Sequence, residues 1–389
     1  MAGPLLGFLG CLALAAGTTL AQSSAARLSR AEKLLSQQLA EQRIPGLSVA
    51  VADRLELVYS AAFGLADVEN NVRVGTGTVF RLGSISKPIT AVAAMQLAER
   101  GRLDLDAPVQ KYVPAFPLKP WPVTSRALLG HLSGIRHYRG PEELLSTRHY
   151  TSLSDALSIF AQDPLEFEPG TRFRYTTYGY NLLGAVVEAA SGMRFTDYLR
   201  EHVFKPSGAE RIQADHVYRI IPNRARGYRR TPAGTVENCA LADTSNKIPG
   251  GGLLATAEDL VRFALALLKG RLLKPETLRE MFTPQRTRDG RPTGYGLGWY
   301  ITERGGTRWI EHSGSQPGAS TELLMLPERG LVVVVLTNLE RAPARAMAYA
   351  LAGIFLDGRD EVACAPSPAT AHFRRTSVPT WACAADSAL

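Results

Sequence analysis

Ser84 and Lys87 stand three positions apart at the start of a predicted helix, so their side chains share one face, one turn apart. A serine hydroxyl is a weak nucleophile at neutral pH and needs an adjacent base to take its proton. A lysine amine can be that base when burial or nearby charge lowers its pKa. Although such pairs are common, this one follows Gly83 and opens an alanine-rich helix. This context favours a catalytic role for the pair over a non-catalytic position on a solvent-exposed helix face.

Two distant stretches offer partners for this pair. Tyr175 lies in a polar loop that enters a helix, and a phenol near cations can relay a proton, partly as phenolate. His312 lies on a predicted strand before Ser313 and Gly314. A strand edge beside a cleft can donate a backbone N–H to an oxyanion while the imidazole adds a hydrogen bond or charge. Structural alternatives stay open for both, because aromatic rings can cap the helical region and a single histidine can be an ordinary core residue.

These motifs come in the order and rough spacing of the serine β-lactamase and penicillin-binding superfamily, whose signature includes Ser-x-x-Lys. The chain resembles the class C branch, which includes esterases, D-aminopeptidases and carboxypeptidases, over about residues 28–358. Within that branch it looks closest to the mitochondrial serine β-lactamase-like proteins and their bacterial relatives. The further stretches that fit are 129–138, 168–170, 175–180, 250–253 and 294–299.

The resemblance implies a role for each motif residue. Ser84 would form the acyl-enzyme, and Lys87 and Tyr175 would share the work of general base. The backbone N–H groups of Ser84 and Ser315 would form the oxyanion hole. The implied substrate contacts are Thr177, Ser313 and Gly314.

Two positions depart from the usual pattern of this superfamily. Thr177 stands where the Tyr-x-Asn motif has an amide, and His312 stands where many members have a lysine. An imidazole carries less charge than an ammonium at neutral pH, so a weaker grip on a substrate carboxylate is expected. Efficient β-lactam hydrolysis is therefore not expected.

The sequence predicts a serine hydrolase that acts through an acyl-enzyme on a peptide, amide or ester. We expect no metal and no cofactor, and none of the seven histidines falls in an H-x-x-x-H zinc pattern. One alternative is a β-lactamase or D-alanyl carboxypeptidase. Another is a catalytically weak relative that binds peptidoglycan fragments or forms filaments. The expected partner is a small-molecule or peptide substrate, and the oligomeric state is left open.

The elements that must position these residues predict an α/β fold. Its antiparallel sheet is built from both chain ends, with helices on both faces and a mostly helical inserted domain. Strands are predicted at 46–52, 55–62, 295–302, 308–312, 321–326 and 331–337, and helices at 28–39, 84–100, 182–190 and from 257. The expected organisation is an α/β domain at 22–101 and 250–362, a helical insertion at 102–249 and a tail at 363–389.

The distribution of charge and the N-terminal residues indicate the kind of partner and the location to expect for the protein. The 44 Lys and Arg exceed the 36 Asp and Glu but are scattered, which does not indicate a nucleic-acid interface. Residues 1–21 carry no charged side chain, run apolar from Leu5 to Ala16 and end in small residues, as a signal peptide does. We therefore expect a secreted or periplasmic protein without a stable membrane span in the mature chain; an uncleaved anchor helix is the alternative.

Overall fold

The computed structural model describes residues 9–356. The first eight residues of the predicted signal peptide and the predicted tail at 363–389 lie outside this range. Within it, no helix combines the length and the apolar character that a membrane crossing requires.

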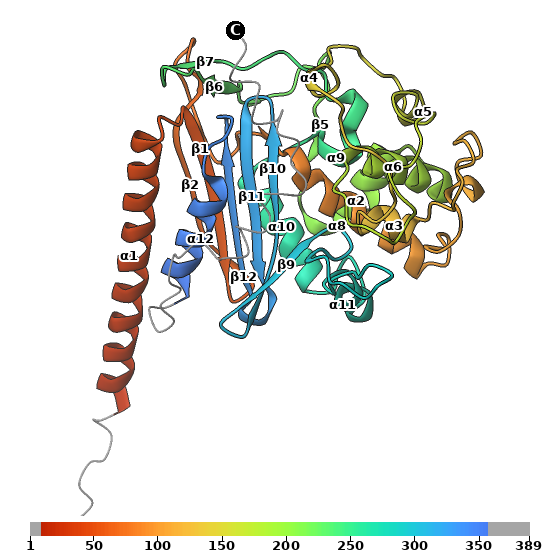
Figure 1. Ribbon diagram of the computed structural model, residues 1–389. Coiled ribbons are helices and arrows are strands. Elements are labelled where there is room, and N and C mark those ends of the chain that lie inside the picture. Colours follow the sequence, from red (N-terminus) through yellow and green to blue (C-terminus); the bar gives the residue numbers. More distant parts are fainter. Residues whose placement is uncertain (1–8, 357–389) are drawn as a thin grey trace, which may run out of the picture.

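A seven-stranded antiparallel sheet forms the centre of the molecule, in the order β3-β2-β1-β12-β11-β10-β9 (Figure 1). Because β1 to β3 come early in the chain and β9 to β12 come late, both chain ends build one sheet, as predicted. Its strands are β1 (Gly46–Asp53), β2 (Glu56–Asp67), β3 (Val72–Arg73), β9 (Tyr300–Arg304), β10 (Thr307–Gln316), β11 (Ala319–Leu326) and β12 (Leu331–Thr337).

Helices cover both faces of this sheet, and each strand sends alternate side chains to the two faces (Figure 1). On β10, Trp309 packs in the outer apolar cluster with α1 and α12, whereas Ile310 packs in the inner cluster with α2 and α10. β12 is buried along its whole length between β1 and β11. This confirms the expectation from its apolar run. The helices named here are α1 (Leu9–Glu41), α2 (Ser86–Glu99), α10 (Ala257–Leu268) and α12 (Ala344–Phe355).

The middle of the chain is mostly helical and loop-rich, and it packs beyond the inner helices (Figure 1). A small sheet of order β4-β8-β5 joins it to the flanking segments. The domain boundaries proposed above stay predictions. The remaining elements are α3 (Ser125–Leu129), α4 (Pro141–Leu144), α5 (Leu153–Leu157), α6 (Thr177–Ser191), α7 (Phe195–Leu199), α8 (Lys205–Ser207), α9 (Ile248–Gly251), α11 (Pro275–Met281), β4 (Phe80–Arg81), β5 (Gln213–Ala214), β6 (Tyr228–Arg230), β7 (Val236–Asn238) and β8 (Leu253–Ala255).

Two predicted elements begin later than expected. The strand predicted at 295–302 starts only at Tyr300, because the preceding loop turns at Gly294 and Gly298, with φ of +70° and +96°. The helix predicted from Ser84 starts at Ser86. Ser84 itself lies in a short 3₁₀ turn, η1 (Gly83–Ile85).

Close approach of β10 to the segment before η1 depends on a glycine. A Cβ atom added at Gly314 would lie 1.9 Å from the carbonyl oxygen of Leu82. We predict that Gly314→Ala lowers the free energy of unfolding by about 1–3 kcal/mol, the usual range for overpacking. Urea unfolding measures this, with Gly353→Ala in α12 as the control, because an added Cβ there meets open space. Equal stability of the two variants would contradict the close packing.

Candidate active site

The η1 turn places Ser84 beside the end of β10. Leu82 N donates to Leu253 O at 2.9 Å, which fixes the chain just before the turn. Gly83 has φ +54°, and a Cβ atom there would lie 2.6 Å from Ser315 N. Only glycine tolerates both the conformation and this approach. Ser84 is therefore held against the strand edge, and it remains partly exposed.

Lys87 lies under Ser84 on the first turn of α2, with its side chain completely buried. Its Nζ atom is 2.9 Å from Ser84 Oγ, 3.2 Å from Thr177 Oγ1 and 2.6 Å from Gly250 O. A neutral amine has two N–H groups and one lone pair. Gly250 O and Thr177 Oγ1 can take the two N–H groups, which leaves the lone pair for the Ser84 hydroxyl.

The surroundings of Lys87 favour this neutral form. Burial lowers the pKa of Lys87 well below its usual range, and the positive charge of Lys247 lowers it further. No carboxylate among residues 9–356 forms an ion pair with Lys87. A buried ammonium without a counter-ion is unfavourable, so the amine is available as a base at neutral pH.

Tyr175 closes the other side of the nucleophile. Its phenol interacts with Ser84, and the centre of its ring lies 4.7 Å from Lys87 Nζ. Burial raises the pKa of Tyr175 well above its usual value, and neighbouring Tyr300 adds to the shift. The expectation of a partial phenolate is therefore wrong, because desolvation disfavours the anion and Lys87 supplies no positive charge when neutral. Tyr175 can still relay a proton as a neutral hydroxyl.

His312 lies on β10 with its ring centre 6.2 Å from that of Tyr175. Its Nδ1 is 2.7 Å from Ser313 O, which can only accept, so Nδ1 carries the hydrogen. Nε2 then accepts from the Tyr295 hydroxyl at 3.2 Å. Burial lowers the pKa of His312 to about 3. The imidazole is thus neutral, and both nitrogens are engaged.

The end of β10 leaves an open backbone edge next to η1. β9 pairs with β10 only as far as Glu311, whereas β11 continues to Gln316. Gly314 and Ser315 lie on this open stretch. The structure therefore brings Ser84, Lys87, Tyr175, His312 and the Ser315 backbone together, and the roles assigned to them stay predictions.

Ser313 is placed differently from its neighbours. Alternation along β10 puts its side chain on the outer face with Trp309, where its hydroxyl donates to Glu322 across the strand pair. Burial raises the pKa of Glu322 well above its usual value, and nearby Glu311 adds to the shift. The expected substrate contact through Ser313 stays a prediction, but its hydroxyl is not directed to Ser84.

Two histidines that the sequence analysis left without a role hold the start of α6. Thr176 N donates to His131 Nδ1 and Thr177 N donates to His137 Nδ1, both at 3.2 Å. Burial lowers the pKa of His131 well below its usual value and that of His137 to about 3. Both rings therefore accept in the neutral form and position Tyr175 and Thr177. Their occurrence in the motif at 129–138 was the available signal.

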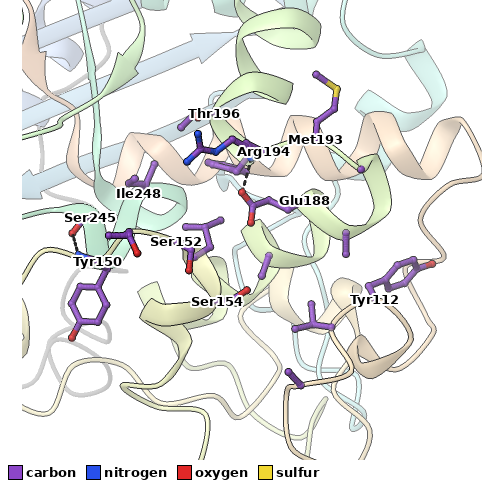
Figure 2. A pocket seen from close by; sticks show the side chains of 18 of the residues that line it. Tyr112, Tyr150, Ser152, Ser154, Glu188, Met193, Arg194, Thr196, Ser245 and Ile248 are labelled. Atoms are coloured by element: carbon purple, nitrogen blue, oxygen red, sulfur yellow. Dashed lines mark hydrogen bonds between the residues drawn. The ribbon is translucent and has the colours of Figure 1, made fainter. Parts of the chain in front are cut away.

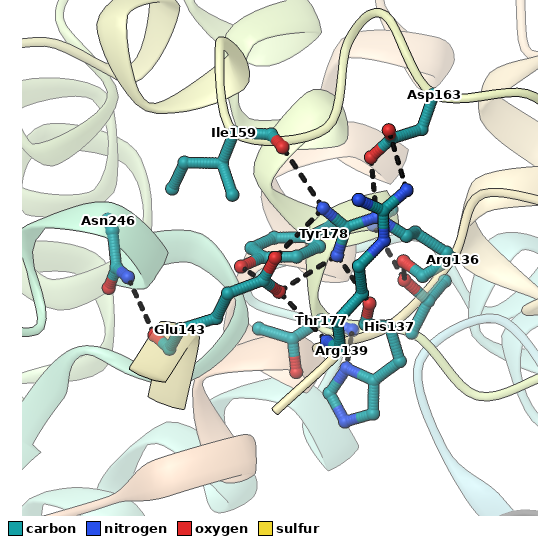
Figure 3. A network of polar contacts seen from close by, with 11 residues as sticks. Arg136, His137, Arg139, Glu143, Ile159, Asp163, Thr177, Tyr178 and Asn246 are labelled. Atoms are coloured by element: carbon teal, nitrogen blue, oxygen red, sulfur yellow. Dashed lines mark hydrogen bonds and ion pairs between the residues drawn. The ribbon is translucent and has the colours of Figure 1, made fainter. Parts of the chain in front are cut away.

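A charged network supports the segment that carries His137 (Figure 3). The Arg136 guanidinium donates to Glu143 and to Asp163, with distances of 2.6–3.0 Å. The Tyr178 hydroxyl donates to the same Glu143 at 2.8 Å, which ties the network to α6. The wall of the site is therefore fixed by several groups.

Two cavities lie in the helical part. The larger, of about 650 Å³, lies among α5, α6 and α7, with Glu188 and Arg194 on its wall (Figure 2). The smaller, of about 330 Å³, is lined by His137 and Arg174 beside Tyr175. Neither cavity is lined by any of the predicted site residues.

A profile of the family described as Beta-lactamase matches residues 31–354. The chain belongs to the beta-lactamase family. Among relatives, the human serine beta-lactamase-like protein LACTB, mitochondrial, is 31% identical, with 79% of this chain and 76% of that protein covered. Penicillin-binding protein 4* of Bacillus subtilis is 30% identical, with 75% and 68% covered. The octameric penicillin-binding protein homologue from Pyrococcus abyssi has a TM-score of 0.74 at 27% identity, covering 85% of this chain and 77% of that one.

These similarities confirm the superfamily and the mixed α/β fold predicted from the Ser84, Tyr175 and His312 motifs. The individual roles of residues in this beta-lactamase family member rest on its own geometry, since matching positions alone do not show activity.

The neutral state of His312 predicts a pH dependence of stability. Its folded pKa of about 3 lies below the value of an unfolded histidine, about 6.5, so the unfolded chain binds the proton first and stability falls as pH drops below about 6.5. Between pH 7.5 and pH 5 this group alone should account for about 2 kcal/mol. Urea unfolding at the two pH values measures this drop in the free energy of unfolding. In His312→Gln the drop should be smaller than in the wild type by that amount. Equal losses would show that His312 is not buried in its neutral form.

Proposed function

We propose that the protein is a serine hydrolase that acts through an acyl-enzyme on an ester, amide or peptide. The observation that carries this proposal is the fully buried Lys87 amine, 2.9 Å from the hydroxyl of the partly exposed Ser84. Acyl transfer requires a nucleophile within hydrogen-bond distance of its base. Here the substrate can reach the nucleophile, whereas the base is shielded from solvent.

In the proposed acylation step, Ser84 Oγ attacks the substrate carbonyl and Lys87 Nζ takes its proton. The oxyanion accepts hydrogen bonds from the backbone N–H groups of Ser84 and Ser315. As the C–O or C–N bond breaks, a proton returns from Lys87 to the leaving group through the Tyr175 hydroxyl. Water then attacks the ester by the reverse sequence and releases the acid and free Ser84.

The charge of the site favours substrates without a carboxylate next to the scissile bond. His312 is neutral with both nitrogens engaged, so β10 offers no cation where a carboxylate would bind. This supports an esterase or amidase within the class C branch over a β-lactamase or D-alanyl carboxypeptidase. A related structure with 26% identity and a TM-score of 0.70 is titled EstCE1, a hydrolase with promiscuous acyltransferase activity.

We further propose export of the protein, because residues 1–21 have the composition of a signal peptide. The human relative is named as mitochondrial, so the two locations are distinguishable by cell fractionation. Mature protein that begins after residue 21 in the exported fraction is the expected result.

Loss of the proposed base should remove most activity while the fold is kept. We predict that Lys87→Met lowers kcat/KM for a short acyl ester by about 10² to 10⁴, the usual contribution of a general base. Lys111→Met serves as the control, because Lys111 is exposed and its ion pair with Asp104 spans 3.9 Å. Ser84→Ala should abolish covalent labelling by a fluorescent phosphonate. Labelling that persists in Ser84→Ala would refute the nucleophile.

A matched pair of substrates tests the charge argument. We predict that an N-acyl-D-alanyl-D-alanine with its carboxylate blocked as a methyl ester is cleaved at the amide bond at least tenfold faster than the same peptide with a free carboxylate. The neutral imidazole leaves that carboxylate unpaired, and a hydrogen-bonded charge is commonly worth about 1.5–3 kcal/mol. Steady-state kinetics give the ratio. Faster turnover of the carboxylated peptide, or of a chromogenic cephalosporin, would instead support the carboxypeptidase or β-lactamase alternative.

A further inference from the structure

A second completely buried lysine, Lys247, lies in the wall of the site. It ends a 3₁₀ turn, η4 (Ser245–Lys247), directly before α9, and α9 carries the Gly250 carbonyl that accepts from Lys87. Lys247 Nζ donates to Leu144 O at 2.5 Å. Lys87 and Lys247 are the only lysines buried within the described part of the chain.

Packing alone does not account for an amine at this position. A methionine side chain would fill a similar volume without a charge to desolvate. Lys247 forms no ion pair with a carboxylate of residues 9–356; the face of the Tyr138 ring lies 5.3 Å from Nζ instead. A cation over a ring face keeps part of its charged character in a buried place.

Lys247 reaches the base through two side chains. The Tyr138 ring contacts Lys247 Nζ, and its hydroxyl interacts with Thr177. Thr177 Oγ1 is in turn 3.2 Å from Lys87 Nζ. The two amines therefore face each other across one phenol and one hydroxyl, in a region that excludes water. Like charges at such range oppose each other strongly because screening is weak.

We propose that Lys247 is a positioning residue whose positive charge keeps Lys87 in its neutral, proton-accepting form, in place of a cation on β10. The inference rests on the proposed hydrolase function, since it concerns the base of that reaction. His312 occupies the β10 position from which a cation could act on Lys87, but its imidazole is neutral and supplies no charge.

The other groups around the two amines hold a constant charge over the relevant range. Burial lowers the pKa of Lys247 to about 7, with Arg81 adding to the shift and Asp243 opposing it. Lys247 is therefore charged at the lower pH at which Lys87 would otherwise take a proton. Burial favours the neutral form of the histidines and tyrosines that face the pair, namely His131, His137, His312, Tyr138, Tyr175 and Tyr180, whereas Arg136 and Arg174 beside His137 are positively charged.

The pH dependence of Ser84 labelling by a fluorophosphonate tests the proposal. In the wild type, the labelling rate should rise with pH as Lys87 loses its proton. In Lys247→Met this rise should move to higher pH by about one unit, so that the rate on the acid limb falls about tenfold and recovers at higher pH. Lys247→Arg keeps the positive charge, so its labelling rate should rise at the same pH as in the wild type or at a lower pH. Lys269→Met, at an exposed position, is the control.

Each outcome has one meaning. A rate lowered equally at all pH values in Lys247→Met would show a structural role and overturn the proposal, as would an unmoved limb. Absence of labelling in the wild type would instead refute the hydrolase function itself. If Lys247→Met does not fold, Lys247→Gln against Lys247→Arg gives the same comparison of neutral and charged side chains.

Discussion

The burial of the Lys87 amine is the constraint on which the site depends. Its Nζ atom contacts Ser84, Thr177 and the Gly250 carbonyl, and no carboxylate of the described chain pairs with it. Desolvation without a counter-ion favours the neutral amine, which turns an ordinary lysine into a base. An acidic partner would stabilise the ammonium and remove the base. The absence of a nearby carboxylate within residues 9–356 is therefore as important as the contacts themselves.

Each contact to the amine comes from a different element, and the fold fixes their distances. α2 carries Lys87, the start of α6 carries Thr177, and α9 carries Gly250. β10 brings an open backbone edge to Ser84 because two glycines allow the close approach. Sites supported by helices and strands hold their groups more accurately than sites on loops alone. The sheet built from both chain ends therefore brings together residues that are more than 200 positions apart in sequence, such as Ser84 and Ser315.

Local patterns allowed much of this to be predicted. The spacing of Ser84 and Lys87 places both on one helical face, and the apolar run of β12 requires cover on both sides, so neither depends on distant residues. The state of Tyr175 could not be predicted, because burial by the folded chain outweighs the nearby cations that suggested a phenolate. The direction of Ser313 depends on the register of β10 against β11, which its own sequence does not specify. Lys247 lies beside the site only because long-range packing puts it there.

Titration of Lys87 in the folded protein tests the central claim most directly. In Ser84→Ala protein with ¹³C-labelled lysines, NMR would follow the Lys87 side chain as pH changes, with assignment from Lys87→Met. The account predicts a midpoint far below that of the exposed lysines, so that the amine is neutral at pH 7. A midpoint in the ordinary lysine range near 10.4 would mean that Lys87 is a permanent cation, and it would contradict its role as the base.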